Sequence, residues 1–122
     1  MTGYVDGYVL PVAKKNLGKY AKMALEGSKV WKKHGALEYY ECAGDDLNPK
    51  WASIKFPKAV QAKPGETVVF AFVVFKSRKH RDSVNAKVMK EMEEKHKDHD
   101  EKDMPFDMKR MAYGGFKTIV HA

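Results

Sequence analysis

The least ambiguous strand in this sequence is the stretch Thr67-Val68-Val69-Phe70-Ala71-Phe72-Val73-Val74-Phe75. It consists of β-branched and aromatic residues with a single alanine, a composition that predicts a β-strand. Side chains alternate between the two faces of a sheet, and here both alternating sets are apolar. We therefore expect this strand to be covered by other structure on both sides.

The sequence around this strand predicts five further elements. Apolar periodicity predicts strands over 4–12, 36–43 and 109–120, and helices over 14–33 and 78–95. Ser77 stands where it can cap the second helix, and a short strand is expected near Trp51–Phe56. The resulting βαββαβ order predicts an α+β fold with a ferredoxin-like sheet and both helices on one face.

Such a sheet has a second face that the helices do not cover. Leaving apolar surface in water costs roughly 25 cal/mol per Å². Two occupants solve this problem: an RNA that stacks on the face, or a second copy of the chain. The residues that we expect on this face are Phe70, Phe72 and Val74, together with Tyr4, Asp6 and Tyr8 of the first strand.

Length and composition define the class of protein. The 122 residues predict one domain over 1–122, and 43% hydrophobic with 32% charged residues exclude global disorder. The longest apolar run, Val68–Phe75, is far shorter than the roughly 20 residues that cross a bilayer. The first residues show no export signal, and the single Cys42 cannot close an internal disulfide. We therefore predict a cytoplasmic protein without membrane association.

Charge and one motif bear on nucleic acid as a partner. The formal charge is +7, but the basic residues are spread along the chain and many alternate with acids. The run Phe70–Phe75 fits the last six positions of the RNP1 pattern of RNA-binding domains. Val68 and Val69 stand where that pattern needs a basic residue and glycine. We favour a core strand and expect no nucleic-acid partner, with RNA binding at Phe70 and Phe72 as an alternative.

Several strings together carry a family resemblance. They are Tyr4-Val5-Asp6-Gly7-Tyr8-Val9, His34-Gly35-Ala36-Leu37, Glu41-Cys42 with Asp45-Asp46, Val68-Val69-Phe70, Ser77 with Arg81-Asp82 and Asn85, and Met104-Pro105-Phe106-Asp107-Met108-Lys109-Arg110-Met111-Ala112-Tyr113-Gly114-Gly115-Phe116. On these residues the chain resembles the YbaA-like family of uncharacterised conserved bacterial proteins. The resemblance implies a homodimer in which two ferredoxin-like sheets close face to face as a dimeric α+β barrel. It implies no catalytic residues and no cofactor, and the lysine-rich stretch 90–102 departs from the family pattern.

Polar residues on the first and last strands are candidates for a ligand site. Asp6 and Tyr8 are two residues apart and so share a face. The first and last strands are neighbours in a ferredoxin-like order, so we expect Arg110 or Lys109 to approach Asp6. An Asp–Arg pair there is either a core ion pair, which we favour, or a site for a carboxylate or carbonyl group.

Two functions use these residues. The first is a homodimer that binds a small acidic or aromatic metabolite in a pocket of the barrel, lined by Asp6, Tyr8, Arg110 and Tyr113. The alternative is a cofactor-independent oxygenase or isomerase. In that enzyme Asp6 or Asp107 is the general base, and Tyr113 or Arg110 polarises a carbonyl.

The remaining reactive residues have simpler interpretations. Cys42 lies beside Glu41 with no cation to activate its thiol, so we predict a small buried hydrophobic residue. His34 ends a helix, where a cation is favourable. His96 and His99 are three residues apart among acids, and we expect no specific metal site there.

The second helix begins with Arg78, Lys79, His80 and Arg81. Cations at this end of a helix cost roughly 0.3–1 kcal/mol each. We favour a solvated helix start over an anion-binding site, although free backbone N–H groups beside guanidinium groups suit an anion.

Overall fold

The computed structural model describes residues 3–96 and 104–122 and is built around two long paired strands. Strand β1 (Tyr4–Ala13) pairs antiparallel with β3 (Glu66–Phe75) along its whole length, from Tyr4 opposite Phe75 to Ala13 opposite Glu66. The strand predicted over 67–75 is confirmed. Its odd-numbered residues are buried, whereas its even-numbered residues include Phe70, which is 43% exposed, so among the described residues only one of its two apolar faces is fully covered.

Two shorter strands complete the sheet. Strand β2 (Glu38–Ala43) pairs with β3, and β4 (Ala112–Lys117) pairs with β1, giving an antiparallel sheet in the order β2-β3-β1-β4. The prediction of a last strand over 109–120 was too long at both ends. A 3₁₀ turn over Met108–Arg110 precedes β4, and β4 ends at Lys117, the residue that pairs with the start of β1.

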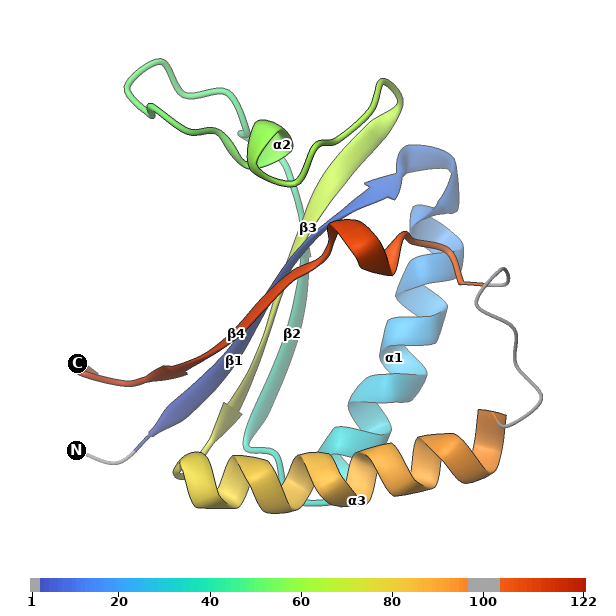
Figure 1. The fold of residues 1–122 in the computed structure, drawn as a ribbon, viewed down its shortest axis with the longest axis vertical. Coiled ribbons are helices and arrows are strands. Elements are labelled where there is room, and N and C mark those ends of the chain that lie inside the picture. Colours follow the sequence, from blue (N-terminus) through green and yellow to red (C-terminus); the bar gives the residue numbers. More distant parts are fainter. Residues whose placement is uncertain (1–2, 97–103) are drawn as a thin grey trace.

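The helices α1 (Leu17–Lys33) and α3 (Arg78–His96) lie on the same side of the sheet (Figure 1). A 3₁₀ turn over Lys14–Asn16 precedes α1, so the helical segment that starts at residue 14 is confirmed in two parts. The Ser77 hydroxyl accepts a hydrogen bond from the His80 backbone N–H at 3.1 Å, which confirms the predicted cap of α3. No helix among the described residues is long and apolar enough to cross a membrane.

Two apolar clusters join the helices to one face of the sheet. The buried members of the first are Val30, Ala36, Val73, Phe75, Val84 and Val88. Those of the second are Leu10, Val12, Tyr20, Ala24 and Val69. The partly buried Tyr4 and Tyr8 also pack against the first cluster, so both clusters contain even-numbered residues of β1 and odd-numbered residues of β3. We call this side of the sheet the helix face, and the opposite side the open face.

The register corrects the expectation for the open face. Phe70, Phe72 and Val74 lie there as predicted, but Tyr4, Asp6 and Tyr8 do not. Because Tyr8 stands opposite Ala71, which is buried against the helices, Tyr8 and its alternating neighbours lie on the helix face. The alternation in β1 correctly predicted that the three share a face but did not determine which one.

The segment between β2 and β3, residues 44–65, forms a projecting loop. A short strand was predicted near Trp51–Phe56, but the segment forms no strand and contains only the single-turn helix α2 (Phe56–Ala59), with Pro57 in its first turn. Figure 1 shows this loop beyond the end of the sheet and away from α1 and α3. Trp51 is 87% exposed and Ile54 is 75% exposed, so the loop carries large apolar side chains into solvent.

Candidate functional site

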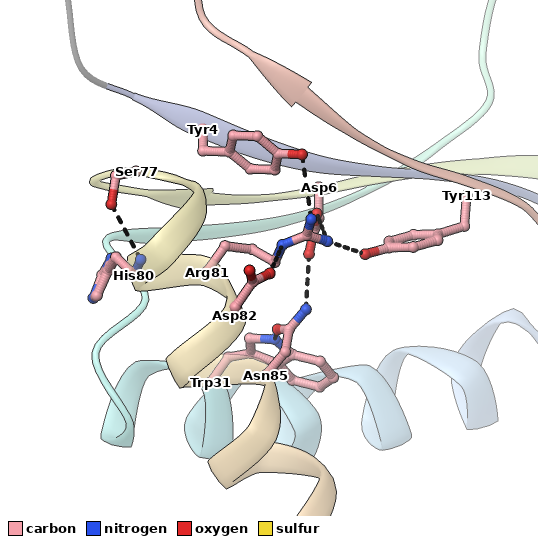
Figure 2. Close-up of polar contacts among 9 residues, drawn as sticks. All are labelled: Tyr4, Asp6, Trp31, Ser77, His80, Arg81, Asp82, Asn85 and Tyr113. Atoms are coloured by element: carbon pink, nitrogen blue, oxygen red, sulfur yellow. Dashed lines mark hydrogen bonds and ion pairs between the residues drawn. The ribbon is translucent and has the colours of Figure 1, made fainter.

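Asp6, the third residue of β1, is fully buried on the helix face. Its Oδ1 accepts a hydrogen bond from Nη1 of Arg81 at 3.1 Å, and its Oδ2 accepts one from Nδ2 of Asn85 at 3.0 Å (Figure 2). Both partners stand on α3, one turn apart. A buried carboxylate requires a cation and further donors to offset its lost hydration, and these two side chains supply them.

Arg81 contacts four polar side chains. Besides Asp6, it donates to the Tyr113 hydroxyl at 2.7 Å and to the Tyr4 hydroxyl at 3.2 Å, and its Nε lies 3.0 Å from Asp82. Its guanidinium carbon also stands 4.8 Å from the centre of the Tyr4 ring. Burial disfavours the charge, but Asp6, the two tyrosines and Asp82 together raise the pKa of Arg81, which stays a cation.

This contact explains one irregularity of the sequence and corrects one prediction. The cations at the start of α3 oppose the helix dipole, but Arg81 is there as the counter-ion of Asp6. The prediction that Arg110 or Lys109 approaches Asp6 was wrong, because the partner comes from a helix. Strand pairing alone could not reveal a partner from another element.

Arg110 instead forms ion pairs at the end of the sheet that is remote from Asp6. It donates to both carboxylate oxygens of Glu66, at 2.7 and 2.9 Å, and to Asp107 at 3.0 Å. The hydrogen bond from Arg110 lowers the pKa of Glu66 to about 2, and that from Arg110 with the Lys109 N–H lowers the pKa of Asp107. Glu66 pairs with Ala13, seven residues from Asp6 and hence about 23 Å along β1. Asp107 and Arg110 therefore do not share a site with Asp6.

Tyr8 and Tyr113 do lie beside Asp6, as predicted. They face each other across β1 and β4, with ring centres 4.9 Å apart. Burial, followed by the negative charge of Asp6, raises the pKa of both phenols, so both stay protonated and able to donate. Tyr113 is half exposed, so the group formed by Asp6, Arg81, Tyr8 and Tyr113, which we call the Asp6 cluster, is reached from solvent at Tyr113.

The Asp6 cluster is better arranged to hold a group than to remove a proton. Both Asp6 oxygens already accept hydrogen bonds from Arg81 and Asn85, and the carboxylate is fully enclosed. The outer part of the cluster offers an aromatic surface and a hydroxyl next to a guanidinium. These groups suit the ring and the polar substituent of a small ligand.

A second polar group on the helix face was missed at the sequence level. Glu41 accepts hydrogen bonds from the hydroxyls of Tyr20 and Tyr39, each at 2.7 Å. The signal was present in the Tyr39–Glu41 alternation of β2, which places both side chains on one face. Cys42, next in the strand, was expected to be buried but is exposed, because it points to the open face of an edge strand.

Of the three histidines considered in the sequence, one forms a contact with a glutamate and the other two lie wholly or partly outside the described residues. His34 follows the last residue of α1, as predicted, and its Nε2 lies 2.8 Å from Glu91. Hydrogen bonds from Lys33, Lys95 and His34 lower the pKa of Glu91 to about 2. The side chain of His96 and the whole of His99 fall outside the described part. Within that part, no three His, Cys, Asp or Glu side chains form a group that could hold a metal ion.

Comparisons with known proteins give a family. Residues 3–108 match the family model described as "Protein of unknown function (DUF1428)". The chain is 38% identical over 117 residues to "Uncharacterized protein YbaA" of Escherichia coli K12, covering 96% of this chain and 97% of that protein, and the same figures hold for YbaA of Shigella flexneri. Among solved structures, "De novo designed protein Foldit4" has a TM-score of 0.47 at 11% identity, covering 98% of this chain and 99% of that chain.

Proposed function

We propose that this chain, which belongs to the DUF1428 family of proteins of unknown function, is a homodimeric protein that binds a small ligand. Its membership of this family confirms the resemblance to YbaA. In this proposal the ferredoxin-like sheet closes against that of a second copy as a dimeric α+β barrel. Each copy binds a small aromatic or acidic metabolite on its helix face. The strand order β2-β3-β1-β4 supports the ferredoxin-like assignment.

The open face supports the homodimer, and it is the observation that carries the proposal. Phe70 is 43% exposed, Tyr40 is 49% exposed and Phe116 is 60% exposed, and Tyr40 stacks on Phe72 with ring centres 4.8 Å apart. These residues come from β2, β3 and β4, and the Phe116 ring lies beside Gly7 of β1, so the apolar side chains extend over the width of the sheet. Contiguous apolar patches of this kind mark association surfaces, since burying them removes the cost of hydrating them.

The projecting loop and the C-terminal end suit the same partner. The loop over residues 44–65, which carries the exposed Trp51 and Ile54, extends beyond the sheet and away from the helices (Figure 1). Ile119 and Val120 follow β4 with most of their surface exposed. A second copy seated on the open face would lie between these segments and cover their apolar side chains. The resulting interface would be more apolar than the remaining surface, as in obligate homodimers.

The Asp6 cluster supports the ligand site. The ring of Tyr113 is half exposed and packs beside that of Tyr8, which offers an aromatic ligand a surface. The Tyr113 hydroxyl stands 2.7 Å from Nη1 of Arg81, so a ligand carboxylate or carbonyl can take its place on the guanidinium. Asp6 accepts a hydrogen bond from Arg81 on one oxygen and from Asn85 on the other, and the Trp31 ring nitrogen donates to Asn85 at 3.1 Å. The site is therefore held rigidly before a ligand arrives.

The homodimer is tested by placing a charge on the open face. We expect Phe70→Glu to convert the dimer to a monomer in sedimentation velocity at low micromolar concentration, because a second copy would bury the new carboxylate. Met89→Glu is the matched control, since Met89 is 52% exposed on α3 and outside the open face. A native protein that sediments as a monomer, or a Phe70→Glu variant that stays dimeric, contradicts the proposal. A monomer that binds oligo-RNA in a salt-dependent way would favour RNA on the open face.

The ligand site is tested with 4-hydroxybenzoate, an aromatic acid. Binding should raise the melting temperature of the native protein, since a ligand stabilises the state that binds it. Tyr113→Ala should remove most of this rise because it deletes the aromatic surface. Met89→Ala is the control for loss of a half-exposed apolar side chain, since Met89 lies on α3, outside both the open face and the Asp6 cluster. No rise in the native protein, or an equal rise in Tyr113→Ala, excludes this site for aromatic acids.

A further inference from the structure

Glu41 occupies a distinctive position on the helix face. It stands opposite Ala71 in the sheet, and Ala71 in turn stands opposite Tyr8. Across this row only the methyl group of Ala71 separates Glu41 from Tyr8, whose Cα atoms are about 10 Å apart at two strand spacings. Glu41 itself is half-buried, and its two oxygens accept hydrogen bonds from Tyr20 of α1 and Tyr39 of β2.

Among the side chains that the structure describes, no cation balances the charge of Glu41. Asp6 has Arg81, Glu66 has Arg110, and Glu91 has Lys33 and Lys95. For Glu41, no Lys, Arg or His nitrogen lies within 4.0 Å in residues 3–95 and 104–122. A partly buried carboxylate normally has a cation beside it, because hydroxyl donors alone do not neutralise its charge.

Three tyrosines lie near this carboxylate. Tyr20 and Tyr39 contact it through their hydroxyls, and Tyr8 is close enough that the charge of Glu41 contributes to raising its pKa. Burial and Glu41 raise the pKa of Tyr20 and Tyr39 far above the usual range, so both remain neutral donors. Each uses one of the roughly four acceptor positions of the carboxylate, which leaves positions free for another donor.

From this geometry we propose that Glu41, with the rings of Tyr8, Tyr20 and Tyr39, binds the ammonium group of a small organic amine. The ammonium supplies the missing positive charge and donates hydrogen bonds to the free positions of the carboxylate. The neighbouring rings favour an organic cation over a hydrated metal ion. This inference deepens the proposed function and rests on it for the location of the ligand, since Tyr8 belongs to both groups. The ligand is then an aromatic compound that carries an amino group.

The test compares two probes of nearly the same shape, phenethylamine and 2-phenylethanol, which differ in charge. Isothermal titration and the melting temperature of the full-length protein give the affinity of each. We expect phenethylamine to bind at least tenfold more tightly than 2-phenylethanol, and Glu41→Gln to remove this preference. The glutamine side-chain oxygen can still accept a hydrogen bond from one tyrosine hydroxyl, and its NH₂ group can donate one to the oxygen of the other. The variant should therefore fold. Circular dichroism checks that it does.

Glu26→Gln is the matched control, because it removes the same charge from an exposed side chain of α1. It should leave the preference for phenethylamine intact. Equal binding of the two probes, no binding of either, or an unchanged preference in a folded Glu41→Gln variant overturns the inference. If 4-hydroxybenzoate binds and phenethylamine does not, the amine site fails and the proposed function stands. If phenethylamine binds through Glu41 to a protein that is monomeric, the dimer fails and the amine site stands.

Discussion

The variant Arg81→Met tests the account of the buried Asp6. It keeps a long apolar side chain at the start of α3 but removes the cation 3.1 Å from a carboxylate that is fully buried. Removing one member of such a pair costs about 3–5 kcal/mol, because the remaining charge is left in a medium of low polarity. The hydroxyls of Tyr4 and Tyr113 lose a donor at the same time. For a domain whose total stability is about 5–15 kcal/mol, this is a large loss.

Urea unfolding followed by circular dichroism measures this loss. Variants are compared at one protomer concentration, since the stability of a dimer depends on concentration. Lys79→Met removes an exposed charge from the same turn of α3 and should change stability by less than about 0.5 kcal/mol. The double variant Asp6→Asn with Arg81→Met should be more stable than Arg81→Met alone, because it leaves no buried charge without a partner. The ion pair is contradicted if Arg81→Met lowers the free energy of unfolding by less than about 1 kcal/mol. It is also contradicted if the loss in the double variant equals the sum of the losses in the two single variants.

Three further predictions concern other parts of the fold. The pKa of Glu66, about 2 in the folded chain against an ordinary 4.5, means that its contact with Arg110 stabilises the protein above about pH 4.5 and that this contribution is lost as the pH falls toward 2. Arg110→Met should therefore destabilise the protein at pH 7 and reduce the dependence of the unfolding free energy on pH between about 4.5 and 2, and an unchanged acid profile contradicts this. Phe75→Ala should cost about 3–5 kcal/mol in urea unfolding, because Phe75 is fully buried in the first apolar cluster, and a cost below about 2 kcal/mol contradicts that placement. Gly115→Ala should cost about 1 kcal/mol, because the added methyl meets the Tyr4 hydroxyl and displaces it from Arg81, and equal stability to the native protein contradicts the close approach.

The sequence predicted the parts of the fold that depend on local pattern. The apolar run 67–75 identified β3 because its β-branched and aromatic residues favour a strand at consecutive positions. Ser77 marked the start of α3 because a cap acts within three residues. The structure of segment 44–65 was harder to predict. Its prolines exclude long helices and strands, but they do not determine the course of the chain.

The sequence predicted several residues of the candidate site but not the residues that they contact. Alternation placed Asp6 and Tyr8 together, and β1–β4 pairing brought Tyr113 beside them. The face of the sheet to which they point depends on the register of β1 against β3, a long-range property that alternation alone does not fix. The same limit explains Arg81, which approaches Asp6 only because α3 folds back over the sheet.

The molecular mass in solution tests most directly whether a second copy of the chain covers the open face. One chain has a mass of 13.9 kDa. Light scattering on the eluting peak of native protein, repeated on dilution to about 1 µM, should give twice that mass, as expected for a tight dimer with an apolar interface. A constant mass of 13.9 kDa, with the rings of Phe70 and Phe116 open to solvent, would contradict the account.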